Sequence, residues 1–232
     1  MSYSRIITAF ALAIFAYVGA HGTEVASTAT LTIYYPNYSS VDMAFGSMPD
    51  TSNRTVDFCC EAAFTSQLLS TFSHTNIADY HVGGGKVYKG YTCRAKTGAF
   101  AWGGGKSYFM RKKDYHPQSQ HYNMAFCQYL IILHGQRQPM WERMRRNRTR
   151  YRALCEIGGR LCFCEAKKVM TLEAFVESLV EAKVTNAIYL DMGAGWNYAW
   201  YRDSKDKVVE LFPESKQAKD FKYRTNWVVF YK

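Results

Sequence analysis

Several patterns that would place a chain in a common functional class are missing from this 232-residue sequence. No two of its seven cysteines have the Cys-x-x-Cys spacing that is typical of zinc sites. No Pro/Ser-rich linker divides the chain, and no long apolar run follows the first 20 residues. These absences argue against a zinc site, against linked separate domains and against a stop-transfer segment. We assign the protein no metal and no cofactor.

A phosphate-binding loop is also missing, although Gly105-Lys106-Ser107 matches part of one. The full motif has a glycine five residues before Gly105, where this chain has Phe100, and a helix after the lysine, where this chain has a strand pattern. The sequence therefore argues against nucleotide hydrolysis. Gly83-Gly84-Gly85-Lys86 and Gly103-Gly104-Gly105-Lys106 instead predict hairpin turns that lead into aromatic strands.

The first 20 residues have the layout of a secretory signal. Arg5 supplies the positive start, an apolar run extends from Ile6 to Gly19, and small residues end at Ala20, after which we expect cleavage. A short buried helix is the alternative interpretation. We expect an exported protein, secreted or periplasmic, with no stable membrane span once the leader is removed.

The rest of the chain predicts one large domain with an ample core, since 48% of all residues are apolar. Residues 21–54 form a polar N-terminal segment with one expected strand, Leu31 to Tyr35. Residues 55–232 form the main domain. The seven cysteines lie mostly in apolar, strand-like runs, and we interpret them as buried free thiols that pack as small hydrophobes. A catalytic thiol remains an open alternative.

The net charge of +10 indicates anionic partners, without choosing among phosphorylated sugars, lipid headgroups and nucleic acid. From Arg137 to Arg152 the chain carries seven arginines and one acid, Glu142. Such a cluster binds phosphate-rich surfaces or forms a solvated, mobile loop. Because the leader directs the protein away from nucleic acid, we expect no nucleic-acid partner. Arg152 differs from its neighbours because it begins an apolar strand, and its planar guanidinium suits bidentate binding of phosphate.

Strand patterns outnumber helix patterns. One helix is predicted from Glu61 to Phe72, because Phe64, Leu68, Leu69 and Phe72 lie at helical spacing. A second helix is predicted to start at Thr171, which can cap it. The expected fold class is therefore α+β, a single domain with mixed, largely antiparallel sheets and two main helices.

One stretch, residues 186–198, has the pattern of a site. A short apolar strand ends in Asp191-Met192-Gly193-Ala194-Gly195, and Trp196, Asn197 and Tyr198 follow. Such a strand presents one carboxylate on a loop in which glycines let backbone approach a bound group. The alternative is a tight turn in which Asp191 caps its own backbone and Trp196 packs in the core.

Three motifs together resemble the phosphodiester glycosidase family: Cys60-Glu61-Ala62-Ala63-Phe64, Arg152-Ala153-Leu154 and the Tyr189–Gly195 stretch. The stretch from Phe58 to Lys232 is similar to a short secreted branch of that family seen in gut Bacteroides. In the family the first motif usually reads Asn-Gly-Gly-Phe, with Glu61 at the asparagine. The third usually reads Leu-Asp-Gly-Gly-Gly-Ser, from which Met192, Ala194 and Trp196 depart.

The resemblance implies a hydrolase of sugar-1-phosphate diesters in envelope or extracellular glycans. Asp191 would stabilise an oxocarbenium-like centre or act as a base toward water, Glu61 would be the second carboxylate, and Arg152 would clamp the diester. The expected substrate-binding residues provide an anion nest (Gly193, Gly195), a stacking ring (Trp196), an amide for sugar hydroxyls (Asn197) and proton donors near neutral pH (His74, His81).

A second hypothesis is a noncatalytic envelope protein that binds anionic glycan through the same cleft. Both hypotheses require three strand ends, distant in sequence, to meet in space. In both, the expected partner is an anionic glycan or glycosyl phosphodiester.

Overall fold

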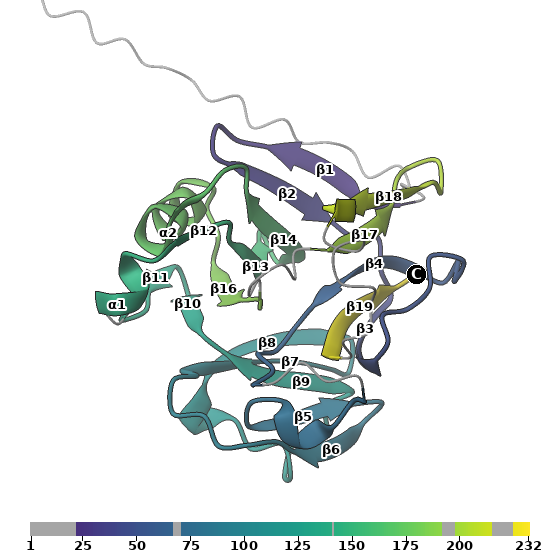
Figure 1. Ribbon diagram of the computed structural model, residues 1–232, viewed down its shortest axis with the longest axis vertical. Coiled ribbons are helices and arrows are strands. Elements are labelled where there is room, and N and C mark those ends of the chain that lie inside the picture. The colour runs from purple at the N-terminus through teal and green to yellow at the C-terminus, as the bar shows by residue number, and fades with distance from the viewer. Residues whose placement is uncertain (1–21, 67–70, 141, 192–197, 215–224) are drawn as a thin grey trace, which may run out of the picture.

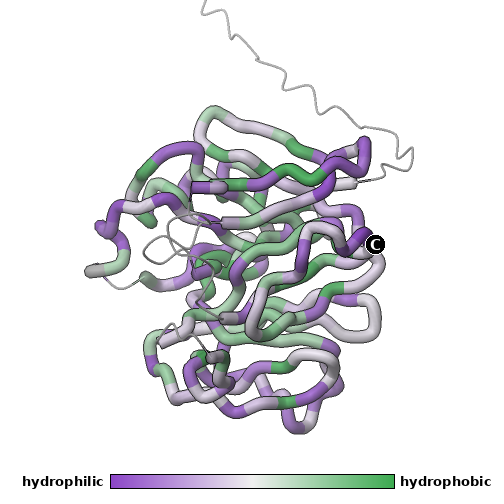
Figure 2. The backbone as a smooth tube through the Cα atoms, turned by 45° about the vertical axis from the view of Figure 1, so that its right-hand side comes forward, coloured by the Kyte–Doolittle hydropathy of each residue, from purple (hydrophilic) through white to green (hydrophobic). Residues whose placement is uncertain are grey.

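The computed structural model describes residues 22–66, 71–140, 142–191, 198–214 and 225–232 (Figure 1). Strands dominate these residues and form four antiparallel sheets. Figure 2 shows that hydrophobic residues follow the strands in the middle of the molecule, while hydrophilic residues gather in the outer loops. No helix in the described residues is long and apolar enough to cross a membrane. The expected leader lies outside the described residues.

The largest sheet contains seven strands and includes the strand expected in the polar N-terminal segment, residues 21–54. β2 pairs with β14 in the middle of the chain, so this segment forms part of the sheet. In spatial order the strands are β1 (Glu24–Ser27), β2 (Leu31–Tyr35), β14 (Arg160–Ala166), β13 (Arg152–Ile157), β16 (Asn186–Tyr189), β10 (Leu130–Leu133) and β11 (Gln136–Arg137).

Two five-stranded sheets complete the main body. The first has the spatial order β18 (Val208–Leu211), β17 (Ala199–Arg202), β4 (Val56–Glu61), β19 (Thr225–Tyr231) and β3 (Ser40–Gly46). The second has the order β6 (Lys86–Lys89), β5 (Tyr80–Gly83), β9 (Met124–Gln128), β7 (Gly98–Gly103) and β8 (Lys106–Arg111). A two-stranded sheet joins β12 (Arg148–Thr149) to β15 (Met170–Thr171).

The predicted hairpin turns are confirmed. Gly84-Gly85 joins β5 to β6, and Gly104-Gly105 joins β7 to β8; all four glycines have φ between +57° and +73°. Two consecutive residues at positive φ match the right-handed twist of the flanking strands, and glycine adopts this conformation without steric cost. The strand β8 therefore begins at Lys106, where a phosphate-binding loop would lead into a helix.

The prediction of an α+β fold with two main helices is wrong, because the described chain is mostly strand with one helix longer than a single turn. That helix, α2 (Leu172–Glu181), begins as predicted, with the Thr171 Oγ1 accepting from the Ala174 amide at 3.1 Å. The other helical segments are α1 (Glu142–Arg145) and the 3-10 turns η1 (His74–Asn76) and η2 (Lys112–Asp114).

The helix expected from Glu61 to Phe72 is absent from the described part of that segment. The Ala62 amide donates to the Asn226 carbonyl at 3.2 Å, and Thr65 forms a bridge with Ile77. These backbone groups are thus satisfied by distant partners instead of by a helical turn. Phe64, expected on the buried face of the helix, is 37% exposed.

The three larger sheets share one core. Phe58 of β4 stacks on Phe163 of β14, with ring centroids 4.1 Å apart, and Phe230 of β19 meets the same ring edge-on. Phe100 and Phe126 of the third sheet belong to the same buried cluster. A second cluster fills the space between α2 and the seven-stranded sheet and contains Cys155, Cys162 and Cys164. All seven cysteines are free thiols and six are buried, as predicted.

The arginine cluster is structured in its described part. Arg137 pairs with Glu177 of α2, and Arg145 pairs with Glu173 of α2 at 2.5 Å. These cations are therefore partly neutralised by the helix beside them.

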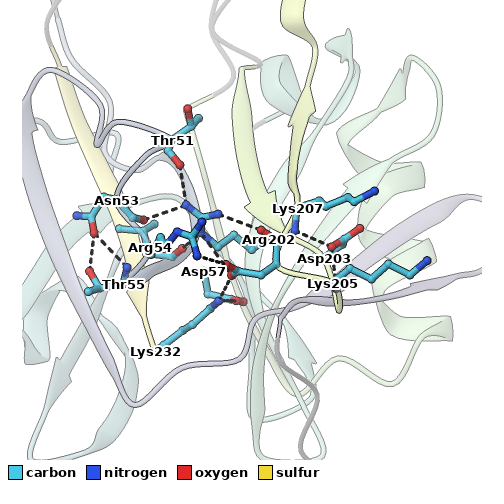
Figure 3. Close-up of polar contacts among 12 residues, drawn as sticks. Thr51, Asn53, Arg54, Thr55, Asp57, Arg202, Asp203, Lys205, Lys207 and Lys232 are labelled. Carbon is cyan, nitrogen blue, oxygen red and sulfur yellow. Dashed lines mark hydrogen bonds and ion pairs between the residues drawn. The ribbon is translucent and has the colours of Figure 1, made fainter.

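Both ends of the described chain contact Asp57. Figure 3 shows Asp57 with Lys232 and Arg202. The Thr23 hydroxyl donates to Asp57 Oδ2 at 2.7 Å, and Lys232 Nζ lies 3.8 Å from Asp57 Oδ1. Beside them Arg202 donates to four carbonyl oxygens, those of Val56, Thr51, Asn53 and Asp206. We call Thr23, Asp57, Arg202, Asp206 and Lys232 the chain-end anchor.

Candidate functional site

The three strand ends that carry Glu61, Arg152 and Asp191 meet. Leu190 donates its amide proton to the Arg152 carbonyl at 3.0 Å, and Asp191 donates its own to the Ala62 carbonyl at 3.2 Å. The second bond links two different sheets, since β4 belongs to one and β16 to the other. The backbone thus brings together residues 61, 152 and 191, as both functional hypotheses require.

Glu61 is held at this junction by residues that the motifs did not single out. It ends β4 and is 1% exposed, and Trp227 of β19 is its cross-strand partner. The next residues are fixed by the buried side chain of Asn226, which accepts from the Ala63 amide at 2.7 Å and donates to the Ala63 carbonyl at 3.0 Å. A carboxamide in an otherwise apolar strand was the only signal in the sequence that could have identified Asn226.

Arg152 is buried and bound to an acid of the same sheet. Its Nε donates to Glu165 Oε2 at 2.8 Å, its Nη2 binds the same oxygen, and the two residues are direct neighbours across β13 and β14. Burial lowers the pKa of Arg152, but the Glu165 carboxylate together with Cys60 and Tyr34 acts to raise it, and the net shift of the pKa is upward. The guanidinium is therefore charged, and two of its N–H groups are committed to Glu165. Its role as a diester clamp stays a prediction.

Burial raises the pKa of the neighbouring Cys60 thiol to about 12, even though the Arg152 guanidinium acts to lower it. Cys60 is thus a neutral thiol at physiological pH. Burial also raises the pKa of Cys59 well above its usual value. These two cysteines, the nearest in sequence to Glu61, are not activated nucleophiles.

Asp191 is 8% exposed, and its carboxylate acts on a nearby cation, Lys96. Burial lowers the pKa of Lys96, and among the charges that raise it the Asp191 carboxylate has the largest effect. Lys96 Nζ donates to Gln128 Oε1 at 2.6 Å and lies 4.3 Å from the centroid of the Phe64 ring. Lys96 therefore links Asp191 to the third sheet.

Lys96 also lines a hollow of about 560 Å³ that is rich in positive charge. Five of the nine lining residues are cations and none is an acid. We call this the cationic hollow; its lining consists of Arg94, Lys96, Thr97, Arg111, Lys112, Lys113, Leu130, Gln138 and Pro139. Its cations come from two short segments, residues 94–96 and 111–113, and no motif in the sequence indicated that they meet.

The two histidines lie in an aromatic cluster. His74 Nδ1 and His81 Nε2 are 2.9 Å apart, and His74 stacks on Tyr88 with ring centroids separated by 3.7 Å. Phe45 and Phe72 pack against His74 edge-on. Burial lowers the pKa of His81 to about 4 and also lowers the pKa of His74. Both shifts favour the neutral imidazole, and the role of the two histidines as proton donors stays a prediction.

The remaining predicted binding residues, Gly193, Gly195, Trp196 and Asn197, lie outside the described residues, so the anion nest and the stacking ring stay predictions. Within the described residues no group of three His, Cys, Asp or Glu side chains is placed to hold a metal ion. The chemistry that the described junction offers is that of carboxylates and cations.

Comparison with known proteins identifies similar folds. The chain resembles the catalytic domain of zebrafish N-acetylglucosamine-1-phosphodiester alpha-N-acetylglucosaminidase, auto-inhibited by its pro-peptide, with a TM-score of 0.58 and 12% identity over 90% of this chain and 81% of that one. It also resembles a hypothetical protein from Synechocystis, with a TM-score of 0.51 and 10% identity over 90% of this chain and 61% of that one. No protein-family model matches the sequence, and no curated protein does. At these identities the likeness shows a distantly related fold.

Proposed function

We propose that this protein is a secreted hydrolase of glycosyl phosphodiesters, acting on sugar-1-phosphate diester linkages in envelope or extracellular glycans. The observation that carries the proposal is the junction at which Asp191 meets the end of β4, beside the cationic hollow. The distant likeness in fold to a phosphodiester glycosidase catalytic domain supports the same class of reaction. Export to the periplasm or beyond is part of the proposal and depends on the leader.

In the proposed reaction water adds to the anomeric carbon and the bond from that carbon to the phosphate oxygen breaks. The products are the free sugar and a phosphate monoester. Phosphate is a good leaving group, so the main task is to stabilise the positive charge that develops on the sugar ring. Asp191 would provide that charge stabilisation or activate the water, and Glu61 would act as the second carboxylate. Cations beside Asp191 would hold the negative phosphate as it leaves.

The test is the release of sugar from a defined sugar-1-phosphate diester by the wild-type protein and by Asp191→Asn. We expect the variant to lose activity by about 10²-fold or more, because it can neither stabilise the cation nor accept a proton. Asp114→Asn is the matched control, since Asp114 is exposed and does not line the hollow. Equal rates for wild type and Asp191→Asn would remove Asp191 from the mechanism.

A noncatalytic glycan-binding protein is the second candidate. It is favoured by the pairing of Arg152 with Glu165, because that pair already occupies two N–H groups of the guanidinium expected to clamp the diester. Binding of an anionic glycan without turnover across a panel of diesters would support this candidate over the hydrolase.

A further inference from the structure

We infer that the cationic hollow binds the phosphate-bearing side of the substrate, and that this side carries more than one phosphate. The inference rests on the proposed function and specifies its substrate class: a glycan with repeating phosphodiester groups. The argument starts from the number of charges in the hollow and from how they are held.

The positive charge of the hollow exceeds what neighbouring acids neutralise. Lys112 donates to Asp79 Oδ2 at 2.6 Å, so that cation has a partner. Among the described residues no ion pair satisfies the other four cations, which are Arg94, Lys96, Arg111 and Lys113. A phosphodiester carries one negative charge. Lys96 is influenced by the Asp191 carboxylate, which leaves Arg94, Arg111 and Lys113 as cations with no ion pair in the described chain. Three such cations around one hollow match an oligoanion better than a single diester.

Two of the lysines that line the hollow are held in place by hydrogen bonds to the rest of the fold. Lys96 is held by Gln128, which is fully buried and also accepts from the Tyr129 amide at 3.1 Å through the same Oε1. The other polar atom of this side chain, Gln128 Nε2, is a buried donor that has no acceptor among the described residues. Lys112 is fixed by a second bond, to the Cys93 carbonyl at 2.7 Å. Two lysines of the hollow thus have set positions.

The hollow adjoins the strand that leads to Asp191, because Leu130 lines the hollow and pairs with Ile188 of β16. Lys96 also lines the hollow, and the Asp191 carboxylate acts to raise its pKa. A substrate whose anomeric carbon lies at Asp191 would place its first phosphate near Lys96. The next phosphates would reach Arg94, Arg111 and Lys113, which are more exposed than Lys96. Arginine binds phosphate through two N–H groups at once, which suits this outer position. Arg152, already bound to Glu165, is not needed for this binding.

The experiment compares a diester that has one phosphate with a trimer of the same repeat. We expect the KM of the trimer to be lower by on the order of tenfold, which corresponds to one further charge-assisted contact. In Arg111→Ala/Lys113→Ala we expect this advantage to disappear, so that the ratio of the two KM values approaches one. Arg148→Ala/Lys168→Ala removes two exposed cations that do not line the hollow, and it should keep the wild-type ratio.

Binding of tripolyphosphate and of inorganic phosphate, measured by calorimetry, separates the hollow from the catalytic proposal. Tripolyphosphate is expected to bind more tightly, and Arg111→Ala/Lys113→Ala should weaken it by on the order of tenfold or more. If no diester is cleaved but this selectivity holds, the hydrolase proposal fails and the oligoanion site stands. Equal KM values for trimer and single diester, or unchanged tripolyphosphate affinity in the double variant, would overturn the inference. A thermal melt of each variant checks that it is folded.

Discussion

Two groups of cations have opposite surroundings in this fold. Arg152 is buried and paired with Glu165 in the same sheet. Arg94, Arg111 and Lys113 instead line a hollow whose lining has no acid. The charge of Arg152 is neutralised by Glu165, and the pair fixes the end of a strand. The cations of the hollow have no acid in its lining and could bind an external anion. We therefore assign the Arg152–Glu165 pair to structure, whereas the cations of the hollow are the ones that we infer to bind a ligand.

The largest effect should come from breaking the internal pair. Arg152→Ala leaves the Glu165 carboxylate buried without its main cation, and we expect the free energy of unfolding to fall by about 3–5 kcal/mol. Urea denaturation measures the loss. Replacing both partners, as in Arg152→Met/Glu165→Met, should recover most of it because no charge is then buried. A single variant as stable as the wild type would contradict the assignment of Arg152 to the structural group.

A smaller loss in the free energy of unfolding should follow from protonating His81. The pKa of His81 is about 4 in the folded protein against 6.5 for an ordinary histidine, so the unfolded chain binds more protons between these values. The contribution of neutral His81 to the free energy of unfolding is therefore fully present above about pH 6.5. It is lost as the pH falls toward 4, and the loss is roughly 3 kcal/mol. His81→Asn should flatten this part of the stability profile, as measured by denaturation at several pH values. His121→Asn, which changes an exposed histidine, should leave the slope as it is.

The smallest effect should be seen in the hollow. Lys113 is exposed and has no ion pair among the described residues, so we expect Lys113→Ala to change the free energy of unfolding by less than about 0.5 kcal/mol. The same denaturation experiment tests this. A loss of several kcal/mol would show that the hollow is structural after all and would remove the contrast with Arg152.

Local patterns in the sequence predicted the local parts of the fold. The strand Leu31–Tyr35, the glycine hairpins and the Thr171 cap each depend on a few adjacent residues, and the structure contains all three. The helix expected at Glu61–Phe72 failed because its apolar spacing was a local signal, whereas the backbone of Ala63 bonds to Asn226 of β19, 163 residues away, and Thr65 bridges to Ile77.

The site was predictable in part for the same reason. Glu61, Arg152 and Asp191 each stand at the end of an apolar strand, a position that a sequence reveals, and their strand ends do meet. Lys96 and Arg111 stand in polar segments with no distinctive spacing. Their proximity is created by the pairing of β7 with β8 and β9, which no short pattern encodes.

The chain-end anchor makes two segments that are distant in sequence depend on one buried carboxylate. Thr23 and Lys232 contact the same aspartate, and Lys232 also donates its amide to the Thr55 carbonyl at 2.9 Å. A substitution of Asp57 should therefore loosen both segments together, so that amide hydrogen exchange at Thr23 and at Lys232 rises in the same variant.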